Sequence, residues 1–187
     1  MAKLWGHFCT VNQHKWIVLK LCFACGLYKQ GLLHDLSKYS PAEFITGVRY
    51  FCGYRSPNGI ERERFGYSHA WLHHKGRNKH HWEYWTEFSK GVCIPIQMPV
   101  RYVIEMWCDR IAATKVYEKE NYQNDSALKY FMRNYDNVII HPKTKALLAF
   151  MLRYCAEHGC KETIQLINSE VKTKGYQLVE DIDNEAM

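Results

Sequence analysis

The sequence lacks any uninterrupted apolar stretch long enough for a membrane-spanning helix, so we expect no transmembrane segment. Its first residues, MAKLWGHFCTVNQHKW, also lack the apolar run of a signal peptide, because His14 and Lys15 interrupt it. Low-complexity segments, internal repeats and convincing runs of alternating strand residues are missing as well. These absences predict a globular protein of the reducing cytoplasm with mostly free thiols and no membrane partner.

A large excess of positive or negative residues is also missing. The chain has 25 Lys and Arg residues against 19 Asp and Glu residues, a formal net charge of +6. This excess favours a small anionic ligand such as a phosphate ester, but it is too weak to indicate a nucleic-acid partner. The length of 187 residues and the 47% hydrophobic content fit one domain spanning residues 1–187.

Histidine and cysteine are the residues in excess, with ten and eight copies respectively. Five of the histidines fall close together in the middle of the chain: His69, His73, His74, His80 and His81. The cysteines include Cys22-x-x-Cys25 and Cys155-x4-Cys160, a spacing that a zinc site could use. The first pair lies in an apolar helical pattern, so we favour buried thiols that pack as small hydrophobic groups.

Apolar residues recur at helical spacing through most of the chain, which predicts an all-α, single-domain helical bundle. We expect helices over residues 8–25, 27–38, 41–51, 69–75, 98–119, 125–135, 142–157 and 161–172. Ser40 is the expected N-cap of the third helix, with Pro41 in its first turn. Residues 52–66, rich in Gly, Pro, Asn and charge, are predicted to be an exposed loop. The only candidate strands are NVIIHP and YQLVED.

Side chains that can bind metal ions occur in a distinctive order along these elements. They are His14, the pair His34-Asp35, His74, the pair His80-His81, and Asp109. Asp109 lies within an apolar helical pattern, where burying an unpaired carboxylate would be costly. Either it pairs with a neighbour such as Arg110, with Glu105 one turn away, or it binds a metal ion, and the periodicity leaves both readings open.

The order His … His-Asp … His … His … Asp on a helical chain resembles the HD-domain superfamily of metal-dependent phosphohydrolases. The longer string HDLSKYSPAEF … AWLHHKGRNKHHWEYW … MPVRYVIEMWCDRIA is similar to a small group of uncharacterised HD-like proteins of bacteria and phages. The similarity covers about residues 10–115 and does not extend to the C-terminal helices, about residues 125–172. It implies an HD-type helical fold in the cytoplasm of a bacterial cell or a phage-infected host.

The resemblance also implies roles for individual residues. Four match the residues that hold one metal ion in that superfamily: His14, His34, Asp35 and Asp109. His74 and His80 fall where further histidines bind a second metal ion. His73 and His74 point in different directions on a helix, so we assign only His74.

Two of the expected roles concern the substrate. Lys38 matches the lysine of the His-Asp-x-x-Lys variant, which faces the substrate, and His81 is also expected to bind the substrate. Asp35 and Lys38 are the expected catalytic residues, Asp35 by holding the attacking water and Lys38 by neutralising phosphoryl oxygens.

Imidazole and carboxylate ligands suit one or two divalent ions of Mn, Fe, Co, Ni or Zn. The resemblance therefore implies metal-dependent hydrolysis of a phosphate ester, expected to be a nucleotide. Two alternatives stay open at this point: an HD-type diiron oxygenase, and a non-catalytic helical binding module with structural histidines. Assembly into a homo-oligomer, with the C-terminal helices as an interface, is open too.

Overall fold

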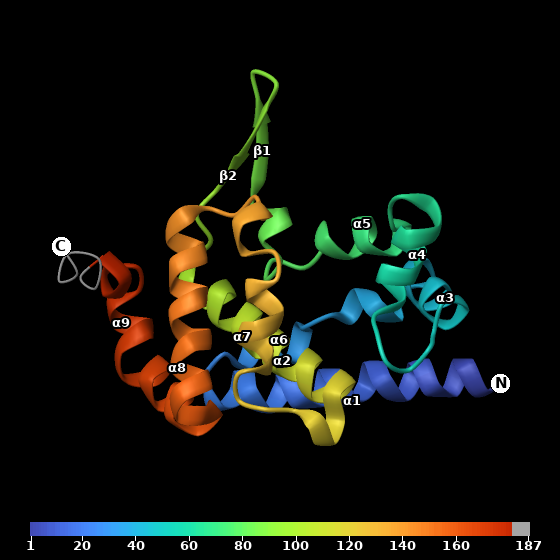
Figure 1. The fold of residues 1–187 in the computed structure, drawn as a ribbon, viewed down its shortest axis with the longest axis horizontal. Coiled ribbons are helices and arrows are strands. Elements are labelled where there is room, and N and C mark those ends of the chain that lie inside the picture. The colour runs from blue at the N-terminus through green and yellow to red at the C-terminus, as the bar shows by residue number, and fades with distance from the viewer. Residues whose placement is uncertain (181–187) are drawn as a thin grey trace.

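In the computed structural model, which describes residues 1–180, most of the chain is helical and a single small hairpin projects from it (Figure 1). The expectation of a helical bundle is confirmed. Three long helices form its framework: α1 (Ala2–Ala24), α6 (Val100–Glu118) and α8 (Pro142–Leu166). Helix α6 contacts both α1 and α8, so one helix borders two different parts of the molecule.

The shorter elements complete the chain. Between α1 and α6 lie α2 (Tyr28–Leu33), the 3₁₀ turn η1 (Leu36–Tyr39), α3 (Pro41–Arg49), α4 (Pro57–Phe65), α5 (His69–Lys75) and the 3₁₀ turn η2 (Trp82–Tyr84). After α6 come the 3₁₀ turn η3 (Lys119–Asn121), α7 (Ser126–Met132), the 3₁₀ turn η4 (Tyr135–Asn137), the π-helical turn η5 (Ile167–Val171) and α9 (Lys172–Lys174). The break that we expected at Gly159 is present as a kink within α8, where this residue has a φ of 82° and a ψ of 169°, and the helical segment after it reaches Leu166.

The helix predicted for residues 27–38 is interrupted at the pair His34-Asp35. Helix α2 ends at Leu33, and Asp35 has a φ of 54°, in the left-handed region that few non-glycine residues adopt. Pro41 begins α3 as expected, but the Ser40 side chain makes no capping hydrogen bond. The turn at His34 and Asp35 therefore separates two short helical segments and presents both side chains toward the molecule's interior, where both are buried.

The prediction of a loop over residues 52–66 was wrong, because Pro57–Phe65 form α4. The residues that suggested a loop are those that begin and end this helix. Ser56 occupies the N-cap position, Pro57 stands in the first turn, and Gly66 ends the helix with a φ of 79°. Because the helix is short, the turn-forming residues at its two ends make up much of the segment, and its composition therefore resembles that of a loop.

The strand predictions were also wrong. Residues 138–141 of NVIIHP form no strand, and YQLVED is a turn followed by helix as far as residue 180, its last residue lying outside the described part of the chain. The strands are instead β1 (Thr86–Ser89) and β2 (Val92–Pro95), which pair antiparallel. Lys90 and Gly91 connect them with φ values of 49° and 77°, as a tight two-residue hairpin turn requires.

The apolar core lies where α1, α6 and α8 meet. Its fully buried side chains include Val18 of α1, Trp107 and Ile111 of α6, and Leu148 and Leu152 of α8. Within residues 1–180, we find no helix with the length and apolarity needed to cross a bilayer.

Candidate metal centre

The candidate site is centred on the carboxylate of Asp35, which is 2% exposed. The left-handed backbone at this residue turns the chain back after α2 and directs the side chain inward. A non-glycine residue in this conformation costs about 1–2 kcal/mol, and such strain is concentrated at functional sites. The two oxygen atoms of Asp35 face two different sets of histidines.

The first set combines α1, the turn after α2, and α6. Oδ2 of Asp35 lies 3.5 Å from Nε2 of His14 and 3.2 Å from Nε2 of His34. Oδ1 of Asp109, on α6, lies 3.0 Å and 3.5 Å from the same two nitrogen atoms. Each of these four residues offers one ligand atom within 4.8 Å of the others, so the group could hold a metal ion.

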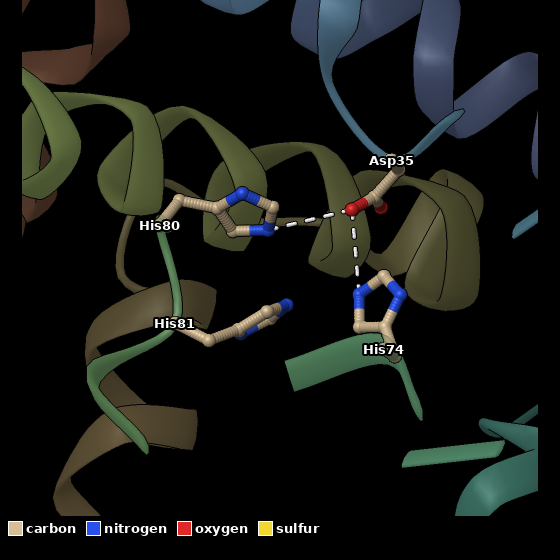
Figure 2. A group of neighbouring side chains, drawn as sticks. All are labelled: Asp35, His74, His80 and His81. Atoms are coloured by element: carbon tan, nitrogen blue, oxygen red, sulfur yellow. Dashed lines mark ion pairs between the residues drawn. The ribbon is translucent and has the colours of Figure 1, made fainter. Parts of the chain in front are cut away.

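The second set lies on the other side of Asp35 and comes from α5 and the turn that follows it (Figure 2). Oδ1 of Asp35 lies 3.3 Å from Nε2 of His74 and 3.4 Å from Nε2 of His80. The ring of His81 points between these two imidazoles in Figure 2, and its ligand nitrogen also falls within 4.8 Å of the others. Asp35, His74, His80 and His81 could therefore hold a second metal ion.

Glu105 contacts one histidine of each set, on the ring nitrogen that faces away from Asp35. Its Oε1 atom accepts from Nδ1 of His34 at 2.9 Å and lies 3.2 Å from Nδ1 of His80. A carboxylate on the outer nitrogen fixes the tautomer and direction of a metal-binding histidine. Glu105 lies one helical turn before Asp109 on the same face of α6, and that spacing is the sequence signal that could have revealed it.

Glu43 of α3 plays the equivalent part for α5. Its two oxygens bind the Nδ1 atoms of His73 and His74, at 2.6 Å and 2.7 Å. His74 then faces Asp35 with its other nitrogen, while His73 belongs to neither candidate metal group. The expectation that only one of these neighbouring histidines faces the site agrees with this geometry. No sequence pattern pointed to Glu43, because its role depends on how α3 packs against α5.

Asp109 contacts the histidines rather than its neighbour in sequence. The Arg110 guanidinium lies over the rings of Trp82 and Phe131, 5.0 Å from each ring centroid. The side chain of Asp109 is 17% exposed, and the ion-pair contacts recorded for it are those with His14 and His34. The ion pairs of Asp109 therefore favour the histidines over the alternative in which its partner is Arg110.

The charges at the site are mutually stabilising. Burial alone would raise the pKa of Asp35, but His34, Lys38 and His74 hold it well below its usual value. Burial would likewise lower the pKa of His34, and the surrounding carboxylates, Asp35 foremost, raise it instead. Lys38 lies with Nζ 2.6 Å from Oδ2 of Asp35, and the nearby carboxylates hold its pKa above the usual range despite burial. Lys38 is thus a fixed positive charge at the edge of the site.

Several buried polar atoms lack a hydrogen bond that meets the usual geometry. Nε2 of His80, Nε2 of His81 and Oδ1 of Asp35 make no hydrogen bond within the described residues. An unsatisfied buried polar group typically costs about 1–3 kcal/mol, so this arrangement favours an additional ligand at the centre. Imidazole nitrogens and carboxylate oxygens are donors that suit a divalent transition metal.

Sulfur takes no part in this centre. Within residues 1–180, none of the groups able to hold a metal ion includes a cysteine. Cys22 and Cys25 are fully buried in the apolar core, as we expected. The alternative of a zinc site built from the cysteines therefore lacks support.

All six side chains expected to bind metal lie in these two groups, with Asp35 shared between them, and a third group of possible ligands consists of His34, His80 and Glu105. His81, expected to contact substrate, lies among the potential ligands, and Lys38 lies beside Asp35. Their binding of a metal ion stays a prediction.

Comparison with known proteins gives one finding. Residues 3–154 match the model of a family described as "Family of unknown function (DUF5662)", and because this match spans most of the chain, the chain belongs to that family. No curated protein and no solved structure matches it. The family description names no activity, so the resemblance to HD-domain enzymes stays a prediction.

Proposed function

We propose that this protein is a metal-dependent phosphohydrolase of HD type that uses two divalent ions held on either side of Asp35. One observation carries the proposal: each oxygen of Asp35 faces a different set of imidazole Nε2 atoms. A carboxylate in this position can be shared by two metal ions. Paired metal sites of this kind serve in phosphatases and nucleases, where they clamp the attacking and leaving oxygens.

The supporting carboxylates strengthen the case for a metal centre over a set of structural histidines. Glu105 and Glu43 bind the Nδ1 atoms of His34, His80 and His74, so the Nε2 atoms of these three rings are free to face Asp35. Histidines that bind metal ions almost always donate their second nitrogen to such a partner. Purely structural histidines would not be expected to turn three Nε2 atoms toward one carboxylate.

The chemistry follows from the charges present. Bound divalent ions would supply a water of lowered pKa and would stabilise charge on a phosphoryl group. Asp35 and Asp109 would hold these ions, and the Asp35 carboxylate stays ionised because its pKa is held low. Lys38, whose side chain is 28% exposed, would meet the phosphoryl oxygens from the solvent side of the site. His81 would serve as a further ligand or as a contact to the substrate phosphate.

The substrate that we propose is a phosphate ester, in particular a nucleotide. The net charge of +6 and the fixed charge of Lys38 support an anionic substrate. The nucleotide itself rests only on the resemblance to HD-domain enzymes.

The first experiment compares two neighbouring histidines. Elemental analysis of the wild-type protein should give two equivalents of a transition metal. His74→Gln should retain about one, because the second set loses a ligand, whereas His73→Gln should retain both, because His73 does not reach Asp35. Equal metal contents in the two variants would contradict the proposed ligand set.

The second experiment tests the reaction. Asp35→Asn removes the shared charge and keeps a residue type that tolerates the left-handed backbone, so the variant should fold but lose metal and all phosphoester hydrolysis. Wild-type protein loaded with its metal would be screened against nucleotides and simple phosphate esters. A wild type that binds two irons and consumes oxygen without hydrolysing any ester would favour the oxygenase alternative. A wild type that binds no metal would favour the non-catalytic module.

A further inference from the structure

We propose that a separate hollow on the outer side of the metal centre binds a polyphosphate anion. The hollow has a volume of about 490 Å³ and lies between α2, the turn after α5 and the start of α6. Sites for small ligands usually have volumes of about 300–1,000 Å³. The size is therefore sufficient for a chain of several phosphate groups.

Charge is the feature that identifies the ligand. Four cationic side chains from three different elements line the hollow: Lys29, Arg77, Lys79 and Arg101. Among the ion pairs recorded for residues 1–180, none involves any of these four side chains. With Glu105 as the one carboxylate in the lining, the four cations leave the hollow with a formal excess of three positive charges. A single negative charge would not balance them, which favours a ligand with several.

The one carboxylate in the hollow, Glu105, offsets one of the four positive charges, but it is turned toward the metal centre. Glu105 is 5% exposed, and its Oε1 atom is occupied by the Nδ1 atoms of His34 and His80. The hollow therefore meets the metal centre only through Glu105 and the outer side of His80. Asp35, Asp109 and Lys38 do not line it, so the hollow is distinct from the side on which we place the hydrolysed substrate.

The start of α6 adds a favourable field. No side chain caps this 19-residue helix, and its first turn contains no acidic residue. The positive end of its dipole therefore lies at Arg101, which lines the hollow. Tyr102 and Leu33 provide an apolar wall beside the four cations, against which a nucleoside attached to the phosphates could pack.

The test is titration calorimetry on the full chain with inorganic tripolyphosphate and with a nucleoside triphosphate. Both should bind, and binding should weaken as salt is raised, because the cations are exposed to solvent. Arg101→Gln and Lys79→Gln should each weaken binding about fivefold, and the double variant should weaken it further. Tighter binding of the nucleoside triphosphate would identify a nucleotide, and equal binding would identify the phosphate chain alone.

Two controls make the proposal falsifiable. Arg133→Gln removes an exposed arginine that lies over Tyr130 much as Arg101 lies over Tyr102, but outside the hollow, and should leave binding unchanged. Asp35→Asn should keep the binding of tripolyphosphate that Arg101→Gln weakens, because Asp35 does not line the hollow, and this holds whether or not the wild type hydrolyses any ester. Equal losses in Arg101→Gln and Arg133→Gln would overturn the proposal. So would loss of binding in Asp35→Asn alone, absence of binding by the wild type, or a clear preference for a single-stranded oligonucleotide over tripolyphosphate.

Discussion

The two ends of the chain bury very different side chains. In residues 1–109 the buried polar groups include the histidines and carboxylates of the site: His14, His34, Asp35, Glu43, His74, His80 and Glu105. In residues 110–180 the buried polar side chains are the hydroxyls of Thr114, Ser126, Thr144 and Thr163. Helix α6 borders both regions, with Asp109 facing the site and Trp107 and Ile111 in the apolar core.

The contrast indicates which region a bound ligand would stabilise. The C-terminal region is stabilised by apolar burial, which needs no further partner. The N-terminal region gathers ionisable groups that lose their water, and some of their atoms lack a hydrogen bond that meets the usual geometry. A bound metal ion would make that region stable, so its removal should affect one region and spare the other.

Removal of metal should give the largest effect. Binding at about a thousand times the dissociation constant stabilises a native structure by about 4 kcal/mol, so chelation should speed amide hydrogen exchange by up to about a thousandfold where the ligands lie. We expect this in the turn at His34 and Asp35 and in α5. Exchange in α8 should change little, and it can be followed in the same mass-spectrometric experiment. An equal increase in amide exchange in both regions would contradict the idea that only the N-terminal region depends on metal.

Substitution in the core should give the opposite pattern. Leu148 is fully buried in α8, and Leu148→Ala should lower the free energy of unfolding by about 3 kcal/mol through lost burial and a cavity. Chemical denaturation would measure the loss. Metal content of the folded variant should equal that of the wild type, because Leu148 contacts no ligand of the centre. A reduced metal content would mean that the two regions are coupled through α6.

Glu105→Gln should act on the boundary between the regions. The amide keeps the size of the side chain but holds the Nδ1 atoms of His34 and His80 less firmly, so metal affinity should fall about 10–100-fold. Competition with a chelating dye would measure the affinity. The control is Glu118→Gln. Glu118 lies at the end of the same helix, away from the centre, and its carboxylate accepts a hydrogen bond from Ser126. It should leave metal affinity unchanged.

The smallest effect concerns the only close thiol pair that we see in the C-terminal region. Sγ of Cys155 lies 3.6 Å from Sγ of Cys160, and its hydrogen bond lowers the pKa of Cys160 to about 6. Cys160 should therefore be mostly thiolate at pH 7, and its alkylation by iodoacetamide should slow as pH falls through 6. Cys155→Ala should slow alkylation at pH 7 roughly tenfold, as measured by peptide mass spectrometry. An unchanged rate would show that the pair does not interact.

Much of the fold could be predicted from local patterns. The apolar periodicity of residues 98–119 predicted α6 nearly to its ends, and His69–Lys75 was predicted to be helical. The errors occurred where short elements are bounded by turn residues. Helix α4 was taken for a loop, and the hairpin at Lys90 and Gly91 was missed because its strands have only four residues each.

The candidate site divides in a similar way. The set of His14, His34-Asp35 and Asp109 was expected from the resemblance to HD-domain proteins, which depends only on residue types and their order along the chain. The spacing of Glu105 from Asp109 offered a sequence signal for Glu105, whereas the role of Glu43 was hidden, because it becomes a partner of His74 only when α3 packs against α5. The cationic hollow was equally hidden, since its four charges come from three separate segments of the chain, at Lys29, at Arg77 and Lys79, and at Arg101, and none of them forms a recognisable motif.

By itself, the sequence determined a helical chain and a set of side chains able to bind metal ions, because helical propensity and ligand chemistry belong to individual residues and their near neighbours. Only the tertiary structure decided that Asp35 stands between two sets of histidines and which ring nitrogens face it. Those properties depend on the relative positions of α1, α5, α6 and the turn after α2, which long-range packing fixes.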